Sequence, residues 1–156
     1  MSKGDLRQEL GDFNSIICFK AVVTGVEDTL GASAAAVALK AAGRRRGRVL
    51  AETLGFGKSP LGLGDAARVL DAAIGVNGTR LCRVDRIVQE GDAVRVALSE
   101  TVCSAGEPQG SSRELSFTLG AVQGAVEVLL AKKLRARQVE SVLRGGTHDV
   151  IELTPV

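Results

Sequence analysis

The stretch LGASAAAVALKAAGRRRGRVLAETLG, residues 30–55, determines how the rest of the chain is interpreted. Its alanines and leucines favour a helix. The hydroxyl of Ser33 can cap the start of that helix and Gly55 suits its end, so we expect a helix from Ser33 to about Leu54. Glycine inside a helix costs about 1 kcal/mol relative to alanine, so two glycines four residues apart predict close contact with a neighbouring element. The residues of this apolar stripe are Leu39, Gly43, Gly47, Leu50 and Leu54.

Arg44, Arg45, Arg46 and Arg48 fall around the rest of this helix. The net charge of the chain is only +2 and its aromatic residues are four phenylalanines, which argues against nucleic acid as a partner. The favoured interpretation is a solvated helix face, on which long side chains reach water. The alternative is that Arg44 or Arg48 anchors the carboxylate of a ligand through paired hydrogen bonds, or meets a partner protein.

The segment before this helix has its own apolar periodicity. Apolar residues at steps of three and four predict a helix that ends at Gly31, with Asp12 or Asn14 as its cap. Its stripe can pack on a sheet or on its own copy in a dimer. The stripe consists of Ile16, Phe19, Val23, Val26 and Leu30.

The segments after it predict one further helix and two hairpins around a third long helix. Asp65 can cap a helix that runs to about Ile74. In the hairpin over 79–102, apolar residues alternate with polar ones along its second arm, as in a half-buried strand. Leu119, Val122, Val126, Leu129 and Leu130 mark the third long helix, and the second hairpin covers 134–154. We therefore expect an α+β fold, an antiparallel four-stranded sheet of two hairpins with helices packed on one side.

The 156 residues suffice for one domain with a substantial core. We expect a flexible N-terminal segment over 1–12 and a single domain over 13–156. No apolar run is long enough to span a bilayer, and the polar start lacks the apolar core of a signal peptide, which favours a cytoplasmic location.

Few side chains suggest chemistry. His148 lies beside a glycine turn, where a solvent-exposed histidine is more common than a catalyst. We expect Cys18 and Cys82 to be small core residues, whereas Cys103 is the best candidate for a reactive or ligand-contacting thiol. No catalytic constellation and no metal site emerge, so the sequence favours a binding protein over an enzyme.

Two blocks resemble the 4-vinyl reductase domain family. Residues 30–55 are similar to its first block, a helix that reads aGr..G..la..lG, through Gly43, Arg44, Gly47, Leu50 and Gly55. Residues 117–155 are similar to its second block, through Gly120, Gly124, Glu140, Gly146 and Pro155. Where the family often has cysteines in the last hairpin, this chain has Leu143 and Asp149 or Val150. A cysteine-based metal site is therefore not expected.

The resemblance implies a fold shared with small subunits of vesicle-tethering (TRAPP) complexes and similar to haem-based nitric-oxide sensors, in which helices and an antiparallel sheet enclose a hydrophobic cavity. It implies a homodimer that binds a hydrocarbon, a lipid-like molecule or a tetrapyrrole. The protein would act as a carrier, a sensor or an assembly accessory, and a photosynthetic bacterium is among the sources that the resemblance implies. Haem is disfavoured, because His148 is the single histidine and Cys103 the one convenient thiolate. The candidate ligand-binding residues are Arg44, Gly47, Arg48, Cys103, Phe117, Gly120 and Gly124.

Two alternatives stay open at this point. The first is a protein-interaction module with a filled core, in which the glycines serve tight packing and the first helix or the arginines meet a partner. The second is a reductase of a vinyl-bearing pigment, which the family name suggests, although the chain shows no nicotinamide or flavin motif.

Overall fold

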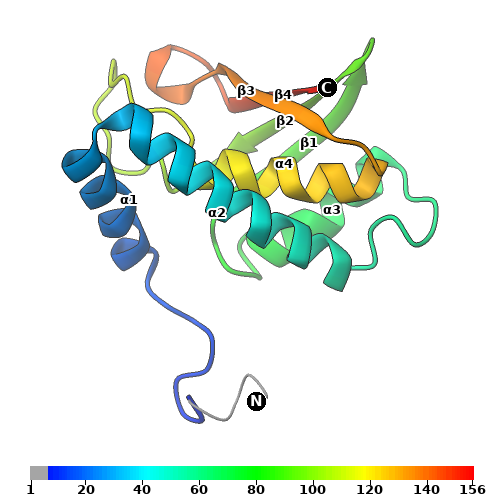
Figure 1. The fold of residues 1–156 in the computed structure, drawn as a ribbon, viewed down its shortest axis with the longest axis horizontal. Coiled ribbons are helices and arrows are strands. Elements are labelled where there is room, and N and C mark those ends of the chain that lie inside the picture. Colours follow the sequence, from blue (N-terminus) through cyan, green and yellow to red (C-terminus); the bar gives the residue numbers. More distant parts are fainter. Residues whose placement is uncertain (1–6) are drawn as a thin grey trace.

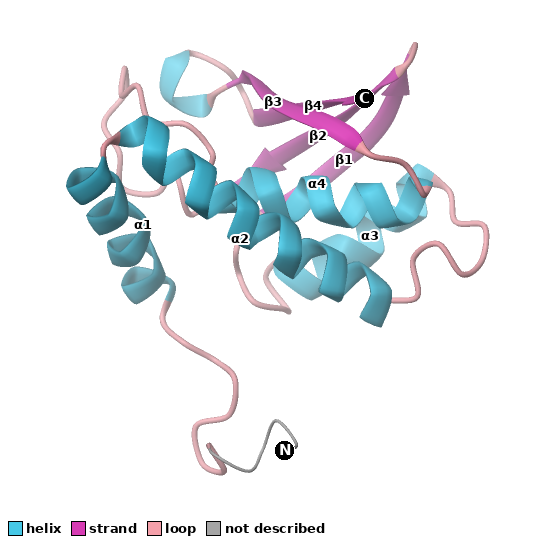
Figure 2. Cartoon of the chain, viewed as in Figure 1, coloured by secondary structure: helices cyan, strands magenta, loops and turns pink. Residues whose placement is uncertain are grey.

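The computed structural model describes residues 7–156, which form helices on one side of an antiparallel sheet. The helices of this part of the chain are α1 (Ile16–Leu30), α2 (Ala32–Thr53), α3 (Leu63–Ile74) and α4 (Phe117–Leu130), with a short 3-10 helix η1 (Val142–Arg144). The strands are β1 (Arg83–Glu90), β2 (Ala93–Ser99), β3 (Leu134–Glu140) and β4 (Asp149–Pro155). The predicted order of elements and the predicted α+β class are confirmed, and Figure 2 shows the helices gathered on one side of the strands.

The two predicted hairpins belong to one sheet with the strand order β1-β2-β4-β3. β2 and β4 join them in the centre, where Val96 pairs with Ile151. Both hairpins are shorter than expected. In the second one, the side chain of Ser141 accepts a hydrogen bond from the Leu143 amide, which turns the chain into η1 and ends the strand at Glu140.

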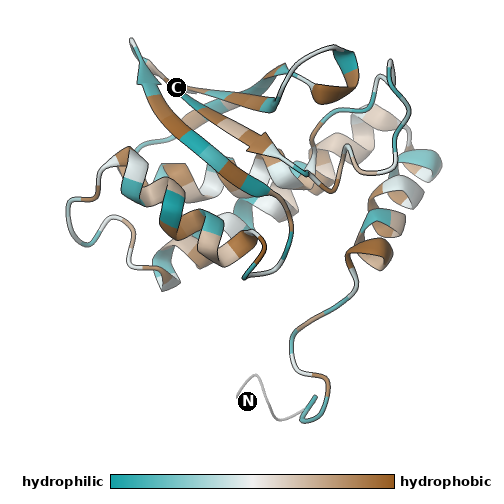
Figure 3. Ribbon diagram, turned by 180° about the vertical axis from the view of Figure 1, so that it is seen from behind, coloured by the Kyte–Doolittle hydropathy of each residue, from teal (hydrophilic) through white to brown (hydrophobic). Residues whose placement is uncertain are grey.

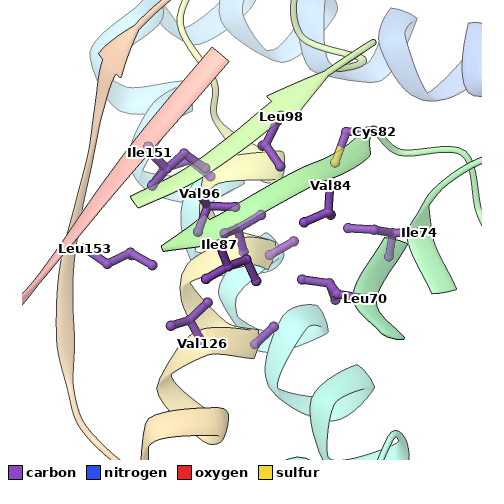
Figure 4. Packing of buried hydrophobic residues seen from close by; sticks show 14 of the residues in the cluster. Leu70, Ile74, Cys82, Val84, Ile87, Val96, Leu98, Val126, Ile151 and Leu153 are labelled. Atoms are coloured by element: carbon purple, nitrogen blue, oxygen red, sulfur yellow. The ribbon is translucent and has the colours of Figure 1, made fainter. Parts of the chain in front are cut away.

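The sheet and the helices form layers (Figure 1). α3 and α4 lie against one face of the sheet, and α2 packs on the outside of α4. Figure 4 shows Leu70 and Ile74 of α3 pointing toward Val84 and Ile87 of β1 in the main core. Because α4 lies between α2 and the sheet, it is apolar on nearly all sides, as a helix in a central layer must be.

α2 and α4 contact each other backbone to backbone. A Cβ atom added to Gly47 would lie 1.9 Å from the carbonyl oxygen of Ala121, and one added to Gly120 would lie 2.1 Å from that of Lys40. Gly43 and Gly124 are equally crowded, with 2.0 and 2.1 Å to the nearest carbonyl oxygen. The close contact that the glycine spacing predicts is confirmed.

The start of α1 differs from the prediction. Ser15 caps α1, in place of Asp12 or Asn14, because its side chain accepts a hydrogen bond from the Ile17 amide at 3.1 Å. A hydroxyl immediately before the first helical residue reaches this free amide better than side chains further upstream. Of the predicted flexible segment, residues 1–6 lie outside the described residues, and 8–12 form a turn.

The starts of α2 and α3 also differ. A single residue, Gly31, joins α1 to α2, and its φ of +82° is a conformation that favours glycine. Ser33 therefore lies inside the first turn of α2 and does not cap it. α3 begins after Gly62, so Asp65 lies in its first turn, where a carboxylate stabilises the helix dipole.

α1 is only lightly buried. Val23 is its one fully buried residue, packed with Ala35 and Leu39 of α2 in a second, smaller apolar cluster. The prediction that Cys18 is a core residue is wrong, because its side chain lies on the outer side of this helix and is exposed. Cys82 is buried, as expected. Within residues 7–156, no helix is long and apolar enough to cross a membrane.

Candidate functional site

An apolar pocket of about 240 Å³ lies between the start of α1 and the main core. Its walls come from α1, α2, α3, α4 and the segment 79–81. The apolar walls are formed by Phe19, Leu50, Leu70, Ile74, Leu81 and Phe117.

The pocket forms where the two apolar clusters of the molecule meet. Phe19 of α1 and Phe117 of α4 pack edge to face, with ring centroids 4.9 Å apart and planes at 76°. Both rings also pack against the main core. Gly47 of α2 and Ala121 of α4, whose backbones touch, also line the pocket. The rim is polar and consists of Asn14, Ser15, Arg46 and Thr79.

A group of ion pairs fixes α1 above the pocket. The Lys20 ammonium donates to the carbonyl oxygen of Cys103 at 2.6 Å and lies 3.6 Å from Glu107. Arg113 pairs with both Glu107 and Glu27 of α1. Burial alone would raise the pKa of Glu107, but Arg113 and Lys20 hold it below its usual value. These charges join α1 to the loop between β2 and α4.

The structure divides the predicted ligand-binding residues into four groups, of which Arg44 and Arg48 are the last. Gly47 and Phe117 line the pocket. Gly120 and Gly124 contact the backbone of α2 at the helix–helix interface. Cys103 is buried outside the pocket lining, with its sulfur 3.8 Å from Ser116 Oγ and 3.9 Å from Thr118 Oγ1.

Arg44 and Arg48 both bind Glu127 of α4 and stay partly exposed, whereas Arg45 and Arg46 are exposed, as expected for a solvated face. Arg44 Nε donates to this carboxylate at 2.9 Å and Arg48 Nη2 at 3.2 Å, and the amide of Leu134 donates at 2.9 Å. The Glu127 side chain is 1 % exposed, whereas those of Arg44 and Arg48 are 38 % and 45 % exposed. Burial would raise the pKa of Glu127, but the bonds from Arg44, Leu134 and Arg48 keep it below its ordinary value.

Sequence reasoning missed Glu127, although a signal was present. It is a single carboxylate in the otherwise apolar run AVEVLL, residues 125–130. A buried charge requires a partner. Its partners were among the arginines of residues 44–48, on the helix that carries the matching glycines.

A second buried acid, Asp149, was also missed. Its carboxylate accepts hydrogen bonds from Thr101 Oγ1 at 2.6 Å, Ser104 Oγ at 2.8 Å and the Val142 amide at 3.0 Å. These bonds join the loop after β2 to the start of β4, which is a structural role. The neighbouring His148 is half-buried rather than exposed, with Nε2 3.6 Å from Asp85 Oδ2, and lies outside the pocket lining.

Comparison with known proteins shows that the fold is shared with two kinds of protein. The chain is similar to the phenol-responsive sensory domain of the transcription activator PoxR, solved with phenol, with a TM-score of 0.68 and 16% identity over 92% of this chain and 75% of that chain. It is also similar to trafficking protein particle complex subunit 3 from Naegleria fowleri, solved covalently bound to palmitic acid, with a TM-score of 0.53 and 13% identity over 91% of this chain and 97% of that chain. No protein-family model matches the chain, and no curated protein matches it in sequence.

Proposed function

We propose that this chain is a non-catalytic domain that binds a small hydrophobic molecule in the pocket beneath α1. The proposal rests on the pocket, which has apolar walls and a few polar groups at its rim, as small-molecule sites usually have. The fold likeness to a phenol-responsive sensory domain supports a sensing role. Membership of the 4-vinyl reductase domain family stays a prediction from the two sequence blocks.

The size of the pocket favours a small ligand. Sites for drug-sized ligands usually measure about 300–1,000 Å³, and this one measures about 240 Å³. A single ring or a short chain therefore suits it better than a tetrapyrrole, which was among the candidate ligands. The reductase alternative has no support from the pocket, which lies apart from His148 and Cys103.

Filling the pocket is expected to weaken the binding of a small ligand. In Leu50→Trp the indole would occupy the space between α1 and α3, so we expect the affinity for phenol to fall by about tenfold or more. The matched control is Val49→Trp, because Val49 is the adjacent residue of α2, is 50% exposed and does not line the pocket. Isothermal titration with phenol compares both variants with the parent protein, and circular dichroism checks that they fold.

Three outcomes decide this test. Binding to the parent protein and to Val49→Trp, but not to Leu50→Trp, supports the proposal. An equal affinity of all three proteins for phenol would show that phenol binds elsewhere. If none of the three proteins gave a heat of binding, the pocket would not have the proposed role.

We also propose a homodimer, because the outer side of α1 exposes apolar residues. Ile17 and Val22 are 78% and 55% exposed, and Val37 of α2 is 73% exposed. Figure 3 shows apolar residues on the first turn of α1, which lies at the edge of the molecule. Exposed apolar groups of this kind are typical of interaction sites.

Charges on the outer side of α1 are expected to shift the protein toward monomer. The double variant Ile17→Glu/Val22→Glu would place carboxylates in an apolar contact, where burying an unpaired charge is strongly unfavourable. Light scattering after size exclusion measures the mass. Val76→Glu, which changes a 61% exposed residue outside α1 and α2, is the control. A parent protein that is already monomeric at high concentration would refute the dimer.

A further inference from the structure

The ligand proposed above can be defined further from one unpaired cation at the pocket rim. We infer that the pocket binds a small amphipathic anion, a carboxylate carried on one ring or a short chain, and that Arg46 is the residue that receives the carboxylate. This inference rests on the proposed function and specifies the ligand of the same site.

Arg46 differs from its neighbours on α2 in its direction. Successive residues of a helix are rotated by about 100°. Arg44 and Arg48 therefore lie on one side of the glycine stripe, where Glu127 neutralises them, and Arg46 lies on the other side, toward α1. Among residues 7–156, none forms a hydrogen bond or an ion pair with the Arg46 guanidinium. The cation at the pocket is thus available to a ligand.

The lining of the pocket contains no opposite charge. Of the described residues that line it, thirteen in all, Arg46 is the one charged residue and none is acidic. A neighbouring hollow shares Asn14, Ile16 and Thr79 with the pocket and adds Arg80, again without an acidic residue among its described lining. Arg80 donates Nε to the Val76 carbonyl at 3.3 Å, which leaves its terminal amino groups for other acceptors. The rim therefore attracts anions.

The other rim groups suit the same head group. An arginine can donate two parallel hydrogen bonds to a carboxylate. The Asn14 side-chain oxygen already accepts from the Ser15 amide at 2.7 Å, so its NH2 group remains as a donor. The Thr79 hydroxyl is a further donor at the rim. The apolar part of the ligand would lie against Phe19, Leu50 and Phe117.

This placement separates Arg46 from the arginines that the sequence proposed as anchors. Arg44 and Arg48 offer the same chemistry, but Glu127 occupies them. If Arg46 were only solvated and had no role in ligand binding, the pocket would bind a charged and a neutral ligand of the same shape with equal affinity.

The experiment compares benzoate with benzyl alcohol, two probes of similar size that differ in charge at pH 7. Isothermal titration is carried out on the parent protein, on Arg46→Gln and on Arg45→Gln. Arg45 is also exposed, and it does not line the pocket, which makes it the matched control. We expect the parent protein and Arg45→Gln to bind benzoate about tenfold more tightly than benzyl alcohol, because a charge-assisted hydrogen bond is stronger than a neutral one. Arg46→Gln is expected to lose this preference and to bind benzoate no more tightly than benzyl alcohol.

The outcomes separate this inference from the proposed function. If benzyl alcohol binds and benzoate binds no better, or if Arg46→Gln keeps the preference for benzoate, the assignment of Arg46 is overturned and the pocket keeps its proposed role. If neither probe binds to the parent protein, the proposed function fails and this inference fails with it.

Discussion

Replacing Gly120 by alanine is expected to destabilise the protein by about 3 kcal/mol or more, because the interface between α2 and α4 has no room for a methyl group at this position. The added Cβ would lie 2.1 Å from the carbonyl oxygen of Lys40 and 2.8 Å from the amide nitrogen of Arg44. Both are backbone atoms of α2, so no side chain can rotate away to make room. The helices would have to separate, and the contacts of α2 with α4 would be lost along their length. Urea denaturation followed by circular dichroism measures the free energy of unfolding.

The matched control is a helical glycine without neighbours. A Cβ added to Gly25 of α1 meets no atom within 4 Å, so Gly25→Ala is expected to stabilise the protein by about 0.5–1 kcal/mol through helix propensity alone. If both variants changed the free energy of unfolding by similar amounts, the backbone contact of α2 and α4 would not be what these glycines serve.

Glu127→Gln is expected to destabilise the protein by about 2 kcal/mol, because it leaves two arginines without their counter-charge. Removing one partner of a fully buried pair costs about 3–5 kcal/mol. The value expected here is lower, because the side chains of Arg44 and Arg48 are 38% and 45% exposed and water screens them. Glu52→Gln, at an exposed position of α2, is the control and is expected to change stability by less than about 0.5 kcal/mol.

The ion pairs of Glu127 with Arg44 and Arg48 predict that the stability of the fold depends on pH. The pKa of Glu127 in the folded protein lies below its ordinary value of 4.5, so its ionised form stabilises the fold fully above that pH. This contribution is lost as the pH falls through the folded pKa. The stability difference between the parent protein and Glu127→Gln is therefore expected to shrink below about pH 4.5. Other carboxylates with lowered pKa values, such as Glu107, Glu140 and Glu152, titrate in both proteins and cancel. A constant difference down to pH 3 would contradict the assignment.

Periodicity and local signals predicted most of the fold. Apolar spacing identified α1, α2, α3 and α4, alternation identified the strands, and the glycine pairs indicated that two helices touch. The caps were less predictable, because Asn14, Ser15 and Ser33 all have suitable side chains. A shift of the helix start by one residue decides whether such a side chain meets a free amide. Hairpin lengths were also missed, because Ser141 and Asp149 compete for the backbone amides that would otherwise extend the strands.

The site was less predictable than the fold. Gly47 and Phe117 were among the candidates and line the pocket, but its other walls come from segments that share no motif. Whether an arginine of α2 meets Glu127 or the pocket depends on its rotation about the helix axis. For Arg44, it also depends on the carboxylate of Glu127, which is 83 residues away in the sequence. The spacing of the arginines gives their relative directions on α2, but local sequence does not show which element faces each of them.

The most direct test of the pocket is a nuclear magnetic resonance titration of the 15N-labelled protein with phenol. If the pocket beneath α1 is the binding site, the amides of Phe19, Gly47 and Thr79 will shift together and saturate with one dissociation constant, whereas the amide of Glu152 on the open face of the sheet will stay in place. Shifts at Glu152 without shifts at Phe19, Gly47 and Thr79, or a spectrum that phenol leaves unchanged, would contradict the account.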